Sequence, residues 1–253
     1  MNTNPLAALL LALPTCLAGA AGMTLRVMGQ ESLPPKWIFR NGAASGVCPD
    51  ILAAIEKAEP RLHFGHTPDY RSVLVVEQGL QNGSVDAACA LLDTPQRNAI
   101  AVRVGPPLYM VRQRLAAAAG DPADIRSLDN LVRQKALVNT SRGAAYIEQL
   151  RALGVEVDDS SGDNLINLKK ILAGHGRFFY MNELTLHWLV RENRLQNKIK
   201  LMPAVLREDP IYFWVSRKAP AQAVELVDAT LKKLAANGEL AHIYARWAGQ
   251  TLP

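Results

Sequence analysis

The sequence predicts an α/β fold of two lobes, and three observations lead to this prediction. Strand-like and helix-like segments alternate through the first half of the chain, in the order strand, helix, strand, helix, strand that is typical of parallel α/β units. The same alternation returns between residues 136 and 181. The chain has 253 residues, of which 49% are hydrophobic and 20% charged, so it can fill two modules that each have a core.

The first half carries the elements of one module. In residues 24–28 polar and apolar side chains alternate around a β-branched valine, so this segment is expected to form the first strand of the module. A short extended piece at 37–40 follows between turn signals, and a helix is expected to begin at Pro49 and Asp50. The next expected elements are a strand at 62–66, a helix at 70–80 and a strand buried on both faces at 85–92.

The second half repeats the pattern and ends in helices. Its expected elements are a strand at 136–138, a helix at 143–153, a strand at 154–157, a helix at 164–172, a strand at 178–181, and helices at 221–237 and 240–247. Ligands of such sheets bind beyond the carboxyl ends of the strands. Two facing modules therefore predict a ligand cleft between the lobes.

Residues 1–21 are typical of a secretory signal peptide. Leu6–Leu13 is apolar and small residues follow it, as at a cleavage site, although no Lys or Arg precedes it. The run is shorter than the roughly 20 apolar residues that a membrane-spanning helix needs. We expect cleavage after Ala20 or Ala21 and a periplasmic protein. Cys16 raises the alternative of a lipid anchor, which the threonine before it disfavours.

Charge and motifs exclude several classes of protein. The net charge is +5, but the basic residues form no dense patch and no recognition motif accompanies them, so we expect no nucleic-acid binding. His63 and His66 lie three apart on an expected strand and point to opposite faces, so we expect no metal site. No catalytic signature and no cofactor-binding loop is present, so we expect no cofactor and no enzyme.

Two cysteines remain after removal of the signal peptide, Cys48 and Cys89. An even pair in an oxidising compartment predicts a disulfide. Closing a loop of roughly 40 residues would add about 3–4 kcal/mol to the free energy of unfolding. Two free, buried thiols are the alternative.

Several motifs resemble the family 3 extracellular solute-binding proteins, the polar amino-acid type receptors of ATP-binding-cassette (ABC) importers. The motifs are Gly83–Ala87, Thr94–Arg97 and Pro106–Tyr109, in that order, with Gly46–Asp50 before them and Pro210–Lys218 after them. The resemblance covers essentially the whole mature chain. It implies capture of a small anionic or zwitterionic solute, with a membrane permease of an ABC importer as the partner, and we expect a monomer.

The resemblance also implies a type II periplasmic-binding-protein fold with a two-segment hinge. Lobe one would comprise residues 23–111 plus 212–253, and lobe two residues 112–211. Two alternatives share this fold: a periplasmic enzyme of the dehydratase type, for which Glu31, Glu183 or Asp209 would supply a cleft carboxylate, and a sensing module of a membrane receptor.

In lobe one, the resemblance assigns the ligand carboxylate to Arg97, whose guanidinium can pair with it through two hydrogen bonds. A surface arginine after the Thr-Pro turn, or a structural ion pair, is the alternative. The backbone near Leu92 and Thr94 would complete the site, although Thr94 is equally explained as a helix N-cap. Trp37 and Tyr70 are candidates for aromatic walls of the cleft, with core packing as the alternative.

In lobe two, the family closes on its ligand with the turn Ser141, Arg142 and Gly143, where a helix N-terminus attracts anions. Alanines follow Gly143 where the family has hydroxyl residues, while Arg142 adds a positive charge, so a more anionic ligand is expected. Asn182 and Glu183 occupy the place of the family's acidic residue for the ligand amine. Glu183 could take an ammonium, or either residue could cap the next helix, which leaves the α-amino group of the ligand in doubt.

Overall fold

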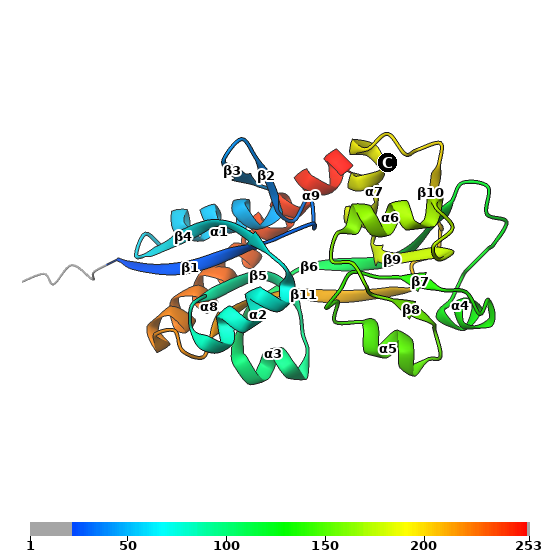
Figure 1. Ribbon diagram of the computed structural model, residues 1–253. Coiled ribbons are helices and arrows are strands. Elements are labelled where there is room, and N and C mark those ends of the chain that lie inside the picture. The colour runs from blue at the N-terminus through cyan, green and yellow to red at the C-terminus, as the bar shows by residue number, and fades with distance from the viewer. Residues whose placement is uncertain (1–21, 252–253) are drawn as a thin grey trace, which may run out of the picture.

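Apolar strands join both lobes into one mixed sheet in the computed structural model, which describes residues 22–251 (Figure 1). The strand order is β4-β1-β5-β11-β6-β9-β7-β8, and β10 pairs with β6. Lobe one contains β1 (Met23–Gln30), β4 (Leu62–Arg71) and β5 (Ala87–Leu92). Because β1 pairs in parallel with both β4 and β5, the expected parallel α/β unit is confirmed.

Helices cover both faces of the lobe-one strands (Figure 1). They are α1 (Val47–Ala58), α2 (Val73–Asn82), α3 (Pro95–Ile100), α8 (Ala221–Ala236) and α9 (Glu239–Thr251). The α1 face formed by Ile51, Leu52 and Ile55 is fully buried, as its spacing predicts. Gly83 caps the carboxyl end of α2, and its φ of 81° is the left-handed conformation that glycine adopts without strain.

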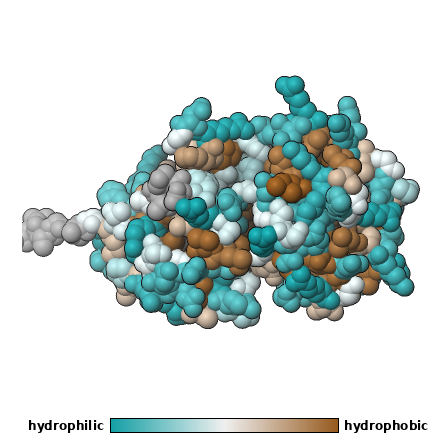
Figure 2. All heavy atoms as spheres, viewed as in Figure 1, coloured by the Kyte–Doolittle hydropathy of each residue, from teal (hydrophilic) through white to brown (hydrophobic). Residues whose placement is uncertain are grey.

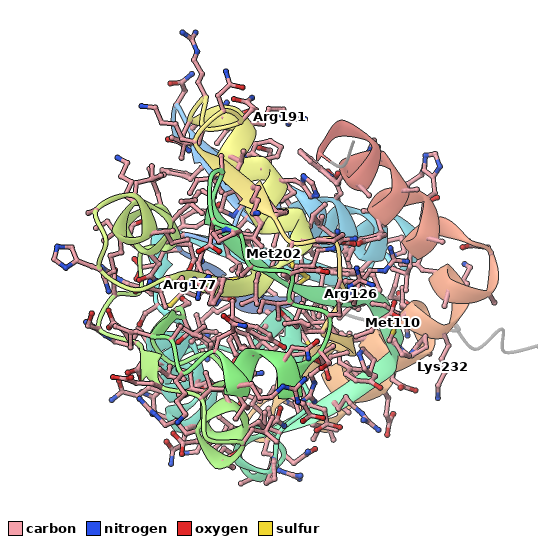
Figure 3. All side chains as sticks on the ribbon, turned by 90° about the vertical axis from the view of Figure 1, so that its right-hand side faces the viewer. Met110, Arg126, Arg177, Arg191, Met202 and Lys232 are labelled. Carbon is pink, nitrogen blue, oxygen red and sulfur yellow. A yellow bond between two sulfur atoms is a disulfide. The ribbon has the colours of Figure 1, made fainter. Side chains whose placement is uncertain are left out.

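Lobe two repeats the layered arrangement. Its strands are β7 (Val138–Asn139), β8 (Val157–Asp158), β9 (Phe178–Asn182) and β10 (Ile199–Leu201), and its helices are α4 (Leu128–Arg133), α5 (Ile147–Ala152), α6 (Asn164–Leu172) and α7 (Glu183–Glu192). Strand β7 pairs in parallel with β8 and β9, which confirms the second unit. In Figure 3, where lobe two faces the viewer, its side chains fill the space between sheet and helices.

Two long strands connect the lobes. They are β6 (Ala101–Ala118) and β11 (Arg207–Ser216), which pair antiparallel. The predicted lobe boundaries fall inside these two strands and stay a prediction. The sequence analysis did not foresee the length of β6, because Gly105 and the two prolines after it indicate a turn. In the structure the register of β6 shifts there, and this irregularity absorbs the prolines within one strand.

Two expected helices begin later than predicted. Helix α2 begins at Val73 rather than near residue 70, because β4 continues to Arg71. Helix α5 begins at Ile147 rather than at Gly143, because the chain first makes an irregular turn at 141–146. That turn faces lobe one.

The surface in Figure 2 is largely hydrophilic, with scattered apolar patches on both lobes. A small hairpin, β2 (Ile38–Arg40) with β3 (Ala43–Ser45), projects from lobe one. Within residues 22–251 no helix is long and apolar enough to cross a membrane. The predicted signal peptide, residues 1–21, lies outside the described residues and remains a prediction.

Candidate functional site

A cavity of about 90 Å³ lies between the lobes. The carboxyl ends of β1 and β5 and the start of α2 border it from lobe one, and the turn 141–146 and the end of β9 from lobe two. Its polar lining consists of Gln30, Lys36, Arg97, Gln113, Ser141, Arg142, Tyr146 and Asn182, and apolar side chains complete the walls. The cavity therefore occupies the cleft position that the fold predicts.

Arg97 reaches this cavity from α3 and is only 4% exposed. The Thr94 hydroxyl accepts a hydrogen bond from the Arg97 backbone N–H at 3.2 Å and so caps α3, while Thr94 itself lies outside the cavity lining. Arg97 Nε donates to Glu77 Oε1 and Nη1 donates to the Leu92 carbonyl, both at 2.7 Å. Nη2 has no hydrogen-bond partner among the described residues. The free end of the guanidinium therefore remains for an anion.

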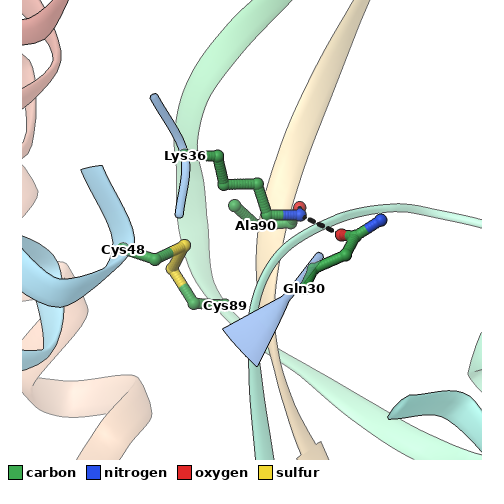
Figure 4. The surroundings of a disulfide bond; sticks show 5 residues. All are labelled: Gln30, Lys36, Cys48, Cys89 and Ala90. Carbon is green, nitrogen blue, oxygen red and sulfur yellow. Dashed lines mark hydrogen bonds between the residues drawn. A yellow bond between two sulfur atoms is a disulfide. The ribbon is translucent and has the colours of Figure 1, made fainter. Parts of the chain in front are cut away.

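Lys36 is a second cation at the cavity, which the sequence analysis missed. Its side chain is 5% exposed, and Nζ donates to Gln30 Oε1 and to the Ala90 carbonyl, both at 2.6 Å (Figure 4). Burial, together with the positive charge of Arg97, lowers the pKa of Lys36 well below its usual value. A lone charged residue between Pro35 and Trp37, in an otherwise apolar stretch, is the signal that could have revealed it.

The backbone next to the disulfide holds one acceptor of Lys36. Ala90 has a φ of 62°, which is uncommon for a residue with a side chain, and the pairing of β5 with β11 shifts register beside it. This irregularity interrupts the ladder where the Ala90 carbonyl receives the lysine. The predicted disulfide joins Cys89, the neighbour of Ala90, to Cys48 at the start of α1 (Figure 4).

The lobe-two turn contributes backbone donors. Gly143 has a φ of 74°, and a Cβ atom there would lie 2.9 Å from Cγ of Leu74, so the turn touches the start of α2. The Ala144 N–H donates to the Ser141 carbonyl, whereas the structure gives the amides of Gly143 and Ala145 no acceptor within residues 22–251. Arg142 is exposed and its guanidinium donates to the Ser160 carbonyl. Both residues line the cavity, and backbone N–H groups without an acceptor in a turn of this kind suit an anion.

Asn182, which ends β9, and Glu183, which follows it, have different surroundings. Asn182 lines the cavity, and its Oδ1 accepts from the Thr185 backbone N–H at 2.9 Å, which makes it the N-cap of α7. Glu183 is 3% exposed and lies 2.7 Å from Arg114 Nε. It is absent from the lining of the cavity. Arg114 therefore already supplies Glu183 with a positive charge, and the expectation that Glu183 could take a ligand ammonium stays a prediction.

The two aromatic candidates belong to the core of lobe one rather than to the cavity wall. Trp37 is 4% exposed and meets Tyr70 edge to face at 5.9 Å between ring centroids. Tyr70 packs so closely on Gly29 that a Cβ there would lie 2.7 Å from the ring. Neither lines the cavity. The alternative of core packing describes both residues.

The carboxylates considered for an enzyme also lie outside the cavity lining. Glu31 is exposed, Glu183 pairs with Arg114, and Asp209 accepts from Arg207 Nε at 2.6 and 2.7 Å. In the described part of the chain no group of three or more potential ligands is placed to hold a metal ion.

Further contacts hold the lobes together around the cavity. The Ser32 hydroxyl accepts from the Asn164 backbone N–H at 2.7 Å, and the Ser32 carbonyl accepts from Asn164 Nδ2 at 2.6 Å. Trp188 of α7 and Trp247 of α9 have ring centroids 6.3 Å apart. The two lobes are therefore in contact around the cavity, as in a closed form.

The family model of the bacterial extracellular solute-binding proteins, family 3, matches residues 25–250. This chain belongs to that family. The expected type II periplasmic-binding-protein fold, with two lobes, is thereby confirmed. The comparison with curated proteins finds no match.

Three solved structures that resemble this family 3 member come from proteins of different kinds. One is a histidine kinase sensor domain with similarity to periplasmic binding proteins, at a TM-score of 0.77 and 20% identity, covering 90% of this chain and 97% of that one. Another is an ancestral arginine-binding protein bound to arginine, at 0.72 and 20%, covering 88% and 97%. The third is the substrate-binding protein of an amino acid ABC transporter, at 0.73 and 16%, covering 89% and 99%. At these identities the likeness establishes the fold.

Proposed function

We propose that this chain is a periplasmic receptor that closes on a small anionic or zwitterionic solute and delivers it to an ABC-type importer. The observation that carries the proposal is the free guanidinium end of Arg97, buried in a cavity between two lobes that are in contact. Glu77 and the Leu92 carbonyl fix the orientation of this side chain, so it is preorganised for a carboxylate.

From lobe two, Gly143 and Ala145 line the same cavity as Arg97, and their N–H groups, which have no acceptor within residues 22–251, would supply donors to the ligand. A ligand that accepts from both lobes is bound more tightly by the closed form than by the open form, and so shifts the equilibrium toward closure. We propose that a membrane permease recognises the closed monomer. The resemblance to the substrate-binding protein of an amino acid ABC transporter supports this role.

A thermal-shift screen tests the binding part of the proposal. The purified protein would be heated with amino acids, dicarboxylates and other small acids, beside an Arg97→Ala variant. A ligand at one hundred times its dissociation constant adds about 2.7 kcal/mol to the free energy of unfolding, which raises the melting temperature visibly. The matched control is Arg126→Ala, since the Arg126 side chain is 77% exposed on lobe two (Figure 3).

We expect a hit that stabilises the wild type and the Arg126→Ala variant but not Arg97→Ala. If a ligand stabilises the wild type and both variants equally, Arg97 does not bind it. No shift across the whole panel would contradict the receptor function itself.

A sensing module remains the second candidate, because one of the similar structures is a histidine kinase sensor domain. The two functions differ in what the closed form contacts. Uptake of the labelled ligand, measured in cells with and without this chain, separates them. Loss of uptake supports the importer role, whereas unchanged uptake with a lost transcriptional response supports the sensor.

A further inference from the structure

The cavity between the lobes has an unbalanced charge. Its lining includes three basic residues, Lys36, Arg97 and Arg142, and no Asp or Glu within the part of the chain that the structure describes. Glu77, which accepts a hydrogen bond from Arg97 Nε, neutralises part of the positive charge of Arg97. The two hydrogen-bond partners of the buried Lys36 ammonium, Gln30 and the Ala90 carbonyl, are both neutral. A buried cation without a carboxylate is unfavourable, so an anion in the cavity would complete the site.

The acidic side chains around the cavity all have basic partners: Glu77 accepts from Arg97, and Glu183 lines an adjoining pocket that shares Lys36. Glu183 pairs with Arg114, and the Asp209 carboxylate accepts from Arg207. The cavity therefore presents no carboxylate to a ligand ammonium. An ammonium would instead meet the positive charges of Lys36 and Arg97, which repel it at short range in a medium of low dielectric constant.

The remaining walls indicate the body of the ligand. Leu33, Val73, Val111, Met181 and Ile211 line the cavity with aliphatic side chains. Such walls favour an aliphatic body over a charged or aromatic one.

Gln113 provides one further polar contact at the floor of the cavity. Its side chain is 2% exposed, and its Oε1 is buried without a hydrogen-bond partner. In this orientation the amide accepts from a ligand hydroxyl, and in the flipped orientation it donates to an oxo group. An ammonium would also satisfy the Oε1 acceptor, but the charges described above oppose it.

We propose that the ligand is a small aliphatic carboxylate without an ammonium group, a 2-oxo or 2-hydroxy acid, and that Lys36 binds its carboxylate together with Arg97. This inference rests on the proposed function, since the same cavity and the same arginine serve both. It adds the substrate class and assigns Lys36 as the residue that decides it.

The test is a titration with acids that share one carbon skeleton and differ only at the second carbon. Isothermal titration calorimetry would compare L-leucine with 4-methyl-2-oxopentanoate and 2-hydroxy-4-methylpentanoate. The corresponding sets of L-valine, L-alanine and L-glutamate cover shorter and more acidic skeletons. We expect that within the set that binds, the oxo or hydroxy acid binds at least tenfold more tightly than the amino acid.

Lys36→Met gives the second arm. It keeps the length of the side chain and removes its charge and donors. Loss of a charge-assisted hydrogen bond weakens binding by about 10- to 100-fold. The matched control is Lys57→Met, which makes the same change at an exposed position of α1 and should bind like the wild type. Circular dichroism checks that the variants fold, and the wild-type titrations decide the ligand class without any variant.

Each outcome has one meaning. An amino acid that binds as tightly as its oxo and hydroxy analogues overturns the inference and leaves the receptor function intact. Equal affinities of Lys36→Met and the wild type remove Lys36 from the site. No binding by any acid in the panel overturns both the inference and the proposed function.

Discussion

The Cys48–Cys89 disulfide should contribute strongly to the stability of lobe one. It links residues 41 apart, α1 to the central strand β5, and both sulfur-bearing side chains are at most 2% exposed. In the chain-entropy description, a cross-link that closes a loop of this length restricts the unfolded chain by about 4 kcal/mol. For a protein of this size, about 4 kcal/mol corresponds to a fall in melting temperature of about 8–16 °C on reduction.

The measurement is urea unfolding of three forms: the oxidised wild type, the wild type reduced in denaturant, and a Cys48→Ala, Cys89→Ala double variant. The reduced wild type keeps both sulfur atoms, so it isolates the cross-link from packing. The double variant should be less stable still, because alanine leaves space in a close-packed core. If the oxidised and reduced wild type unfold at the same urea concentration, the reasoning is refuted, since the cross-link then places no limit on the unfolded chain.

Three further predictions concern the cavity. A bound carboxylate favours the protonated form of Lys36 and raises its lowered pKa, so binding takes up a proton and affinity falls as pH rises between the pKa values of the free and bound protein. Titrations across pH in the wild type and Lys36→Met check this, and an unchanged slope in the variant would contradict it. The charged or titratable groups that line the same or the adjoining pocket are Arg97, Arg142, Tyr146, Tyr109, Arg112, Glu183 and Tyr244. Gly143→Ala should weaken ligand binding about tenfold while leaving the free protein folded. The new Cβ would meet Leu74 and Val73, and the φ of 74° disfavours a side chain. If calorimetry finds an unchanged affinity, the turn does not close against α2. Ser32→Ala removes both hydrogen bonds of the Ser32 hydroxyl between the lobes, the one it accepts from the Asn164 N–H at 2.7 Å and the longer one it donates to Asp163 Oδ1 at 3.4 Å. The shorter bond is worth about 1 kcal/mol, so affinity should fall at least about fivefold with little change in the melting temperature of the free protein. A large fall in that temperature would indicate a role within lobe one.

The sequence predicted the elements that repeat a simple pattern. The buried strands expected at 85–92 and 178–181 correspond to β5 and β9, and the expected helix at 164–172 matches α6 at both ends. Local signals succeeded here because burial and capping act within a few residues. The expected strand at 154–157 overlaps β8 only at Val157, and α2 and α5 begin later than expected. The long strand β6 escaped prediction, since its glycine and prolines are tolerated only through a register shift against β11, which is a tertiary feature.

The candidate site was predicted only in part. Arg97 and the turn at 141–143 reach the cavity, as the resemblance implied. Trp37 and Glu183 do not, because sequence order cannot distinguish a ring that packs in a core, or an acid neutralised by an arginine, from a group that faces a ligand. Lys36 was missed for the converse reason. Its approach to Ala90 depends on a positive φ inside a strand, which no residue pattern indicates for an alanine.

The pair of tryptophans at the rim of the cleft gives the protein a built-in optical reporter. Trp188 and Trp247 come from different lobes, with ring centroids 6.3 Å apart and planes inclined by 53°. The other two indoles, Trp37 and Trp214, are buried within lobe one and keep their surroundings when the lobes part. Opening of the cleft should therefore alter the emission and the near-ultraviolet dichroism of one pair against a constant background. Closure can be followed in real time without attaching a dye.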